Sequence, residues 1–240
     1  MKNTDEIISH TSNRNYPIPD TPWKYSQEWH KILLLHWKVP VSFIEPLLPD
    51  GLEVDTYNGN AWISMVPLSV KKHHYRGFPV LPFVSSFHEV NLRTYVKKGN
   101  TSGIYMFSIE TEKLSTVLMA KCTDGLPYVK SIIERTPNRY LSENNDKQYS
   151  LDLNYIVKNT IEHKSGIDYW LTERHALYQS QNGILYRYDI HHKEWELKEV
   201  QLNYKYIYYQ TDDFQWPKCA PDKVHYCKKI NVLVWPRIQE

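Results

Sequence analysis

The chain has 240 residues, a net charge of +2 and an aromatic content of 14%, with 19 tyrosines and 8 tryptophans. This charge balance argues against a nucleic-acid-binding protein, which needs a basic surface to neutralise phosphates. No apolar run reaches the ~18 residues that cross a membrane, and the polar first residues lack signal-peptide character. We therefore expect a cytoplasmic protein that binds neither nucleic acid nor membrane.

The first part of the chain differs in composition from the rest. Residues 1–22 are polar and contain three prolines, which predicts an extended N-terminal arm. Residues 23–240 fit a single domain, since all-β domains of this length are common. Pro40 and Pro49 bracket a predicted short helix over residues 41–48.

Alternating or apolar runs bounded by turn residues predict a chain made mainly of strands. These runs cover residues 32–37, 61–66, 87–96, 103–109, 115–122, 151–157, 170–178, 183–190, 196–202 and 229–235. After Pro127 the apolar spacing becomes helical and predicts a helix that ends near Pro137. The polar residues 138–150 predict an exposed excursion. Closely spaced strands favour a mainly β, antiparallel sheet or barrel with few helices.

The predicted strand at 87–96 has two different faces. With a period of two, Glu89, Asn91, Arg93 and Tyr95 share one side, whereas Val90 and its apolar neighbours share the other. Either the polar side meets water, or the sheet closes into a barrel and the polar side lines its interior. In the second case a carboxylate and a guanidinium face a dry pocket, and a ligand or their mutual ion pair has to balance them.

Three motifs along the chain resemble a known superfamily. The stretch His88-Glu89-Val90-Asn91-Leu92-Arg93-Thr94-Tyr95-Val96, the Gly103-Ile104-Tyr105 strand and the Gly125-Leu126-Pro127-Tyr128 turn are similar to the core of the acetoacetate decarboxylase superfamily. More closely, they resemble its YqjF-like bacterial branch, whose function is unknown. The resemblance implies one antiparallel β barrel or cone with a few peripheral helices around a small-molecule cavity.

The resemblance also implies site residues. The decarboxylases have an active-site glutamate that corresponds to Glu89, and an active-site arginine whose position falls on His30 here. His30 is thus a candidate pocket residue, although a histidine in Glu28-Trp29-His30-Lys31 is also typical of a surface position. Asn91 and Tyr95 share the face of Glu89 and are candidate cavity residues.

The sequence departs from the family at its reactive lysine. Tyr128 and Val129 occupy the positions of the two lysines, so Schiff-base decarboxylation lacks its amine. Lys130 points away from Tyr128 in the predicted helix, and Lys121 is the remaining amine nearby. Glu89, Arg93 and Tyr128 suit acid–base chemistry on a small carbonyl or carboxylate compound, as in a lyase, hydratase or isomerase.

Several alternatives remain open from the sequence. Tyr128 fills the space of the lysine without a chemical role, or the protein binds a small molecule without turning it over. Assembly into a homo-oligomer is a further expectation, because the arm could contact a partner subunit. We expect no cofactor and no metal, although His175, His191 and Glu173 form an alternative metal-ligand set.

Overall fold

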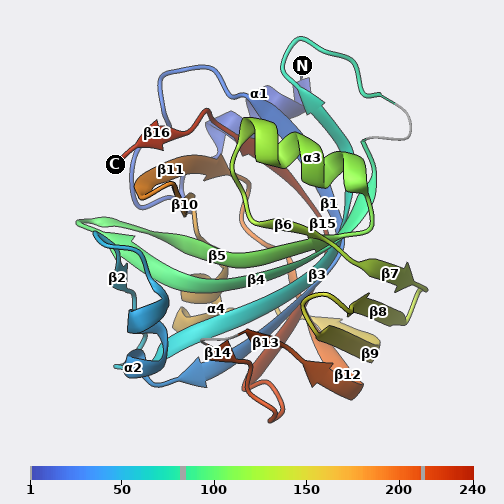
Figure 1. Ribbon diagram of the computed structural model, residues 1–240. Helices are drawn as coiled ribbons and strands as arrows, with labels where there is room; N and C mark the ends of the chain where they lie inside the picture. Colours follow the sequence, from blue (N-terminus) through green and yellow to red (C-terminus); the bar gives the residue numbers. More distant parts are fainter. Residues whose placement is uncertain (1, 82–84, 212–213) are drawn as a thin grey trace.

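The computed structural model describes residues 2–81, 85–211 and 214–240, and a closed ring of strands organises them (Figure 1). In order around the ring, the strands are β1 (Tyr25–Val39), β3 (Ala61–Tyr75), β4 (Phe87–Lys98), β5 (Thr101–Thr111), β10 (Ala176–Gln181), β11 (Ile184–His191) and β15 (Lys223–Val234). β15 pairs with both β11 and β1, which closes the ring. All these pairings are antiparallel except that of β5 with β10.

A second layer of strands continues from β15 and folds over part of the ring. It consists of β12 (Leu197–Tyr208), β9 (Tyr149–Thr160), β8 (Arg139–Asn144) and β7 (Ile132–Arg135). One apolar cluster fills the space between this layer and the outer side of β1, β3 and β4. Another fills the interior of the ring. The barrel therefore has a packed interior and a packed outer wall on one side.

Short elements complete the fold. They are α1 (Lys2–Ser9), α2 (Val41–Ile44), the 3-10 helix η1 (Glu45–Leu47), β2 (Glu53–Val54), α3 (Leu114–Thr123), β6 (Tyr128–Lys130), α4 (Gly166–Thr172), β13 (Gln210–Thr211), β14 (Phe214–Gln215) and β16 (Ile238–Gln239). Figure 1 shows α3 across one end of the barrel. The expected mainly β barrel with a few peripheral helices is confirmed, as is the short helix after Pro40. In the described part of the chain, no helix is long and apolar enough to cross a membrane.

The polar side of β4 faces the interior of the barrel. Phe87 and Tyr95 belong to the interior cluster, while Val90 and Leu92 belong to the outer one. Glu89 lies between them on the interior side and is 3% exposed. The interpretation in which this side meets water is therefore wrong. The apolar side packs under strands of the second layer.

On both sides of the Gly-Leu-Pro-Tyr turn, the secondary structure is the reverse of the sequence prediction. Residues 115–122, expected as a strand, form helix α3, which buries Thr116, Val117 and Ala120 on one face. The helix expected after Pro127 is instead β6, paired in parallel with β5 at Ile109 and Tyr128. β10 pairs with β5 at Ile104 and Tyr105, so the next stretch of β5 needs another partner for its backbone groups. This tertiary requirement overrides the local helical spacing.

Three other expectations need correction. Residues 138–150, expected as an exposed excursion, form the β8–β9 hairpin, in which Tyr140 and Ser142 are fully buried. The strand expected over residues 170–178 begins only at Ala176, because residues 170–172 still belong to α4. A capping box between Ser165 and Asp168 fixes the start of this helix. The arm is not extended throughout, because α1 packs Ile7 against Leu233 and Trp235.

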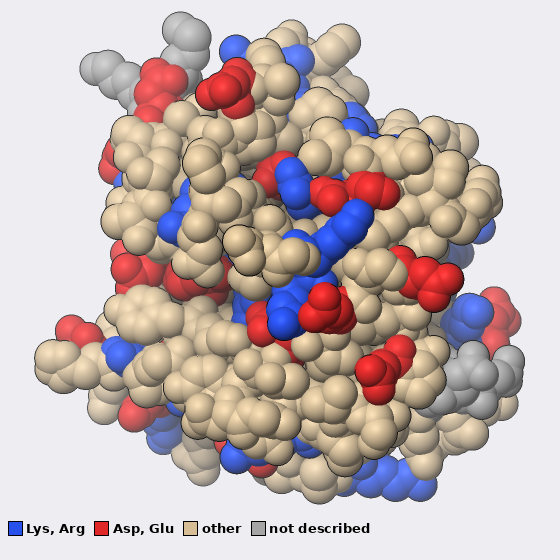
Figure 2. All heavy atoms as spheres, turned by 90° about the vertical axis from the view of Figure 1, so that its left-hand side faces the viewer, with Lys and Arg blue, Asp and Glu red and all other residues tan. Residues whose placement is uncertain are grey.

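Charges on the face that carries the ends of β2, β10 and β11 are mixed in sign. Figure 2 shows Lys and Arg side chains next to Asp and Glu side chains across the middle of this face. Arg187, for example, lies 2.7 Å from Glu240. No continuous basic stripe runs over this view of the described residues.

Candidate functional site

Glu89 and Tyr128 meet beneath α3. Glu89 lies on β4 and Tyr128 begins β6, and both strands flank β5. The Tyr128 hydroxyl donates a hydrogen bond of 2.5 Å to Glu89 Oε1. The structure thus brings together the two residues that the sequence placed at the centre of the site. Asn91 lies on the same side of β4, and its side chain acts to lower the pKa of Glu89.

The pair is electrostatically unusual. Burial raises the pKa of Glu89 to about 7, although hydrogen bonds from Tyr128 and Asn91 oppose this rise. Burial also raises the pKa of Tyr128 well above its usual value, and the Glu89 charge adds to this effect. Tyr128 therefore stays a protonated donor near neutral pH. Glu89 is the member that can exchange a proton.

A narrow pocket lies beside the pair, between α3 and the end of the barrel. Its volume is about 30 Å³, and Tyr25, Phe87, Met119 and Tyr128 are among its lining residues. This volume accommodates a water molecule or two rather than a metabolite. Lys121 and Lys130, the nearby amines, are both exposed and are not among the residues that line the pocket.

Arg93 does not join Glu89. The two residues are four positions apart on one extended strand, a separation of about 13 Å at ~3.3 Å per residue. Arg93 instead lies near a second set of residues. Burial is the main cause that lowers their pKa values, and the positive charge of Arg93 lowers them further; these residues are His36, His192 and Arg174. The site expected from the sequence is therefore divided along β4.

Tyr95 belongs to this second region. Its hydroxyl lies 2.7 Å from Ser64 Oγ and 3.2 Å from His36 Nδ1, and it donates to the Leu171 carbonyl at 3.1 Å. His36, Ser64 and Tyr95 are all fully buried. Tyr95 is therefore held in a polar network inside the barrel, close to α4.

A chain of hydrogen bonds continues from His36 toward the surface. His36 Nε2 lies 3.3 Å from His225 Nδ1, and His225 Nε2 lies 2.8 Å from Asp168 Oδ1. Lys223 pairs with the same carboxylate at 2.5 Å. Although burial alone would raise it, hydrogen bonds from Lys223, Ser165 and His225 hold the pKa of Asp168 well below its usual value. No local sequence pattern indicates this chain of hydrogen bonds, because its members are far apart along the polypeptide.

His30 lies outside both regions. Tyr25 and Trp29 on β1 point into the barrel, and the next residue points to the opposite side. His30 Nε2 pairs with Glu28 Oε2 at 3.0 Å and is partly exposed. The structure therefore does not bring His30 to Glu89 and Tyr128.

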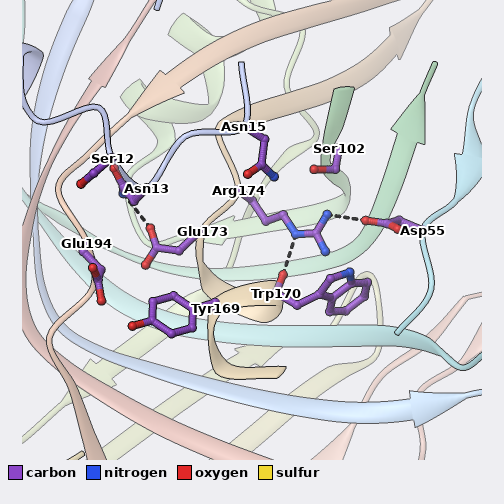
Figure 3. Close-up of a pocket in the computed structure, with 10 residues that line it drawn as sticks. All are labelled: Ser12, Asn13, Asn15, Asp55, Ser102, Tyr169, Trp170, Glu173, Arg174 and Glu194. Carbon is purple, nitrogen blue, oxygen red and sulfur yellow. Dashed lines mark hydrogen bonds and ion pairs between the residues drawn. The ribbon is translucent and has the colours of Figure 1, made fainter. Parts of the chain in front are cut away.

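A larger cavity opens where α4, the segment after β2 and the N-terminal arm meet (Figure 3). Its volume is about 490 Å³, within the range of small-molecule sites. Arg174 and Trp170 line it, together with Asp55 and Glu173. Except for Glu173, these residues carry no sequence motif that predicted a role for them.

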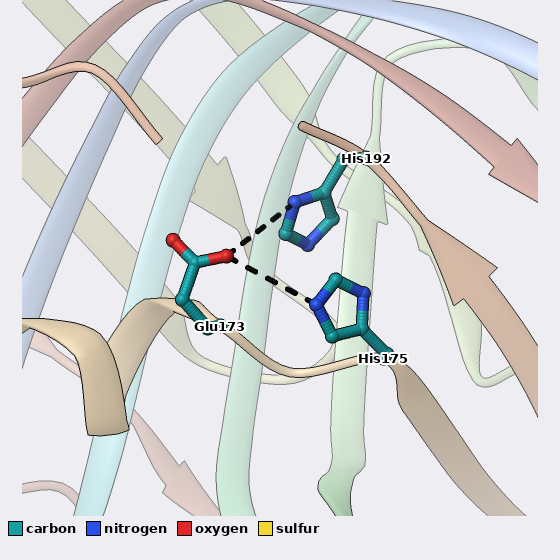
Figure 4. A group of neighbouring side chains, drawn as sticks. All are labelled: Glu173, His175 and His192. Carbon is teal, nitrogen blue, oxygen red and sulfur yellow. Dashed lines mark ion pairs between the residues drawn. The ribbon is translucent and has the colours of Figure 1, made fainter. Parts of the chain in front are cut away.

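Glu173, His175 and His192 form the group of described residues best placed to hold a metal ion (Figure 4). Their candidate ligand atoms lie within 4.8 Å of one another, and His192 replaces the His191 of the expected set. The two imidazole rings are stacked, with an interplanar angle of 28° and ring centroids 4.6 Å apart. His192 Nδ1 already lies 2.8 Å from the Lys193 carbonyl, and Asn13 donates to Glu173 at 2.7 Å. The bond from Asn13 to Glu173, together with that between His175 Nε2 and the Asn13 carbonyl at 3.1 Å, anchors the arm to this cluster.

Sequence comparisons match the chain to a family of uncharacterized proteins. The DUF2071 family, described as an uncharacterized conserved protein, matches residues 26–231. The uncharacterized protein YqjF of Bacillus subtilis (strain 168) is 38% identical over 232 residues, covering 93% of this chain and 95% of that protein.

Solved structures with much lower identity share the architecture. The enduracididine biosynthesis enzyme MppR complexed with pyruvate is similar with a TM-score of 0.62 at 11% identity, over 94% of this chain and 93% of that one. An acetoacetate decarboxylase-like enzyme from Sphingomonas wittichii RW1 gives a TM-score of 0.60 at 13% identity, over 92% and 94%. The chain therefore belongs to the DUF2071 family, and its fold is that of the acetoacetate decarboxylase-like enzymes.

Proposed function

We propose that the protein is an acid–base enzyme, a lyase, hydratase or isomerase, acting on a small carbonyl or carboxylate compound without a Schiff base. The observation that supports it is the 2.5 Å hydrogen bond from Tyr128 to a buried Glu89 whose pKa is about 7. A carboxyl group with this pKa gives and takes protons efficiently at neutral pH. MppR, a structural neighbour, is complexed with pyruvate, so small keto acids are the first compounds to test.

Enolisation illustrates the chemistry. The Glu89 carboxylate removes a proton from the carbon next to the carbonyl group, and the C–H electron pair forms a C=C bond. The carbonyl π electrons move to the oxygen. The protonated Glu89 now donates its own hydrogen to the Tyr128 oxygen, which frees the single Tyr128 hydrogen to bond to the enolate oxygen. Return of the proton from Glu89 to another atom completes an isomerisation. No cofactor takes part in these steps.

Substrate access requires α3 to move, because the pocket beside Tyr128 has a volume of only about 30 Å³. α3 suits this motion. Its N-terminus has no side-chain cap, and its outer positions Leu114 and Leu118 are exposed. The helix is therefore attached mainly through one buried face.

The test uses NMR to follow hydrogen–deuterium exchange in D2O. The protons followed are those on the carbon next to the ketone group of pyruvate and related keto acids. Glu89→Gln is expected to abolish exchange, and Tyr128→Phe to slow it. Glu110→Gln is the matched control, because Glu110 is also a buried carboxyl and accepts a 2.6 Å hydrogen bond from Tyr209, but on the outer side of β5. Absence of exchange in the parent protein, or full activity of Glu89→Gln, would contradict the proposal.

A second candidate function is small-molecule binding without turnover. The observation that favours it is the cavity of about 490 Å³ beside α4, which is far larger than the pocket at Tyr128. In this case the parent protein binds a ligand without converting it, and Glu89→Gln leaves the affinity unchanged. Cytoplasmic location and homo-oligomer formation stay predictions from the sequence.

A further inference from the structure

A continuous series of hydrogen-bond contacts, which we call the histidine chain, begins at Asp168 on α4. Asp168 Oδ1 lies 2.8 Å from His225 Nε2 on β15, and His225 Nδ1 lies 3.3 Å from His36 Nε2 on β1. His36 Nδ1 lies 2.6 Å from Ser64 Oγ on β3. Each of these residues is at most 3% exposed, so the groups of the chain have to satisfy one another.

The chain returns to the helix from which it began. The Tyr95 hydroxyl, on β4, lies 2.7 Å from Ser64 Oγ and 3.1 Å from the Leu171 carbonyl oxygen. Tyr95 is completely buried as well. Asp168 and Leu171, at the two ends of the chain, both belong to α4.

The neutral chain has one hydrogen fewer than it has links. Both end groups can only accept, because Asp168 is ionised beside Lys223, 2.5 Å away, and a carbonyl oxygen carries no hydrogen. The two imidazoles, when neutral, and the two hydroxyl groups between the ends supply one hydrogen each. Five links therefore share four hydrogens. A side contact of 3.2 Å from the Tyr95 hydroxyl to His36 Nδ1 adds an acceptor but no hydrogen.

Tyr95 has two acceptors for its one hydrogen in the neutral chain. Asp168 accepts from His225, and this bond orders the hydrogens as far as Ser64 toward the carboxylate. The Tyr95 hydrogen then bonds either to Ser64 Oγ or to the Leu171 carbonyl. The link from the barrel to the end of α4 is therefore incomplete.

One added proton completes all five links. With a hydrogen on both nitrogens of His225, its Nδ1 donates to His36 Nε2, and the hydrogen of His36 moves to Nδ1 and bonds to Ser64 Oγ. The Ser64 hydroxyl then donates to Tyr95, whose own hydrogen has only the Leu171 carbonyl as acceptor. The chain gains one hydrogen and one positive charge, which the two imidazoles share.

We propose that the histidine chain is a proton-dependent latch, in which uptake of one proton by the paired imidazoles bonds Tyr95 to the Leu171 carbonyl and fastens α4 to the barrel. α4 carries Trp170, which lines the large cavity and whose ring centroid lies 4.7 Å from that of Tyr95. The latch thus acts on one wall of this cavity. It does not depend on the chemistry of Glu89.

The charges around the two rings determine the pH at which the proton enters. Burial lowers the pKa of both imidazoles below the ordinary value of 6.5, so the chain is neutral near pH 7. The Asp168 carboxylate opposes this effect at His225, whereas the charge of Lys223 adds to it at both rings. The other cations that lower these pKa values are Arg93 at His36 and Lys164 at His225.

The test is an NMR titration of the full chain, labelled with 15N in histidine and with 13C in the leucine carbonyl groups. At pH 8 both His36 and His225 should carry their hydrogen on Nε2. Below pH 6.5 the pair should take up one proton in a single transition, and the Leu171 carbonyl resonance should shift with the same midpoint. Failure of the pair to titrate before the protein unfolds, or a Leu171 resonance that does not follow it, would overturn the proposal.

Ser64→Ala divides the chain into two parts, in which the neutral groups supply a hydrogen for every remaining link. The midpoint should therefore fall by about one pH unit, because the charged form loses a hydrogen-bond acceptor. Ser69→Ala is the matched control and should leave the midpoint unchanged, since Ser69 Oγ lies 2.9 Å from His88 Nδ1, outside the chain. The same midpoint in Ser64→Ala as in the parent would contradict the proposed order of the hydrogens.

Tyr95→Phe is the second variant and serves also if Ser64→Ala does not fold. The imidazole pair should still titrate in it, whereas the Leu171 carbonyl resonance should no longer shift with the pair. A shift that persists without the Tyr95 hydroxyl would overturn the latch. Glu89→Gln should leave the histidine titration unchanged, so failure of the latch and failure of the proposed enzyme activity are distinguishable.

Discussion

The hydroxyl of Tyr128 reaches Glu89 from the opposite side of β5, across 2.5 Å. Glu89 is opposite Thr111 on one side of this strand, and Tyr128 is opposite Ile109 on the other. The bond therefore ties the short edge strand β6 to a strand of the barrel. The ionisation of Glu89 therefore affects the stability of the fold as well as the chemistry of the site.

Stability should depend on pH through Glu89. The pKa of its carboxyl is about 7 in the folded protein against 4.5 for an ordinary glutamate, so the folded state holds the proton more tightly. The resulting stabilisation is complete below pH about 4.5 and is lost as the pH rises toward 7. The difference corresponds to roughly 3 kcal/mol, at about 1.4 kcal/mol per pKa unit. Because buried histidines act in the opposite direction over the same range, urea unfolding at pH 5 and pH 8 measures this contribution only when the parent is compared with a variant that cannot ionise at position 89.

Glu89→Gln is the matching variant. Its free energy of unfolding relative to the parent should be higher at pH 8 than at pH 5, because the amide cannot ionise. The same difference at both values of pH would show that Glu89 has an ordinary pKa.

Tyr128→Phe should raise the pKa of Glu89 further, because the hydrogen bond that favours its charged form is lost. At pH 8 the free energy of unfolding should fall by about 1–3 kcal/mol. Carbon-detected NMR titration of the glutamate carboxyls reports the pKa directly. Tyr209→Phe removes the corresponding bond to Glu110 and serves as the control, since it should leave the Glu89 titration unchanged.

Acid should destabilise the protein through its buried histidines. Burial lowers the pKa of His192 to about 4 and that of His175 to about 2, from an ordinary value of 6.5. Below pH 6.5 the unfolded chain takes up protons that the folded protein does not, so stability present above this pH is lost as the pH falls. Thermal unfolding between pH 7 and pH 5 should show this decline, and His192→Gln should flatten it. An equally steep decline in the variant would mean that His192 does not contribute.

Gly103→Ala should destabilise the barrel where β5 meets β10. A Cβ atom at this position would lie 2.6 Å from the Ala176 carbonyl oxygen and 2.9 Å from Ala176 Cβ. Backbone atoms cannot yield as a flexible side chain does, so a loss of about 1–3 kcal/mol is expected. Ser102→Ala, one residue away, is the control in the same denaturant titration. Equal stability of both variants would argue against a close approach of these strands.

The sequence predicted only the part of the candidate site that comes from a single strand and a single motif. The period of two placed Glu89 and Asn91 on one face, and the Pro-Tyr turn added Tyr128. The same period grouped Arg93 with Glu89, but the rise of an extended strand separates them. Shared orientation on a strand does not imply a shared pocket.

Other features depend on contacts that no local pattern contains. His36 and His225 are adjacent because β1 pairs with β15, from nearly opposite ends of the sequence. The helix expected after Pro127 gave way to β6 because β5 required a partner. Local signals predicted the class of the fold and most of its strands, whereas long-range pairing decided the places where local preference was weak.

The pairing of β1 with β15 also determines when the barrel can form during synthesis. β1 is made first, but its partner at this edge emerges only after nearly all other strands. Until then the apolar residues of β1, such as Leu33 and Leu35, have an open backbone edge beside them, which favours association with other chains. Closure is thus late in the order in which the strands are made. Removal of β15 should convert a folded protein into an aggregating one, even though Glu89 and Tyr128 lie elsewhere.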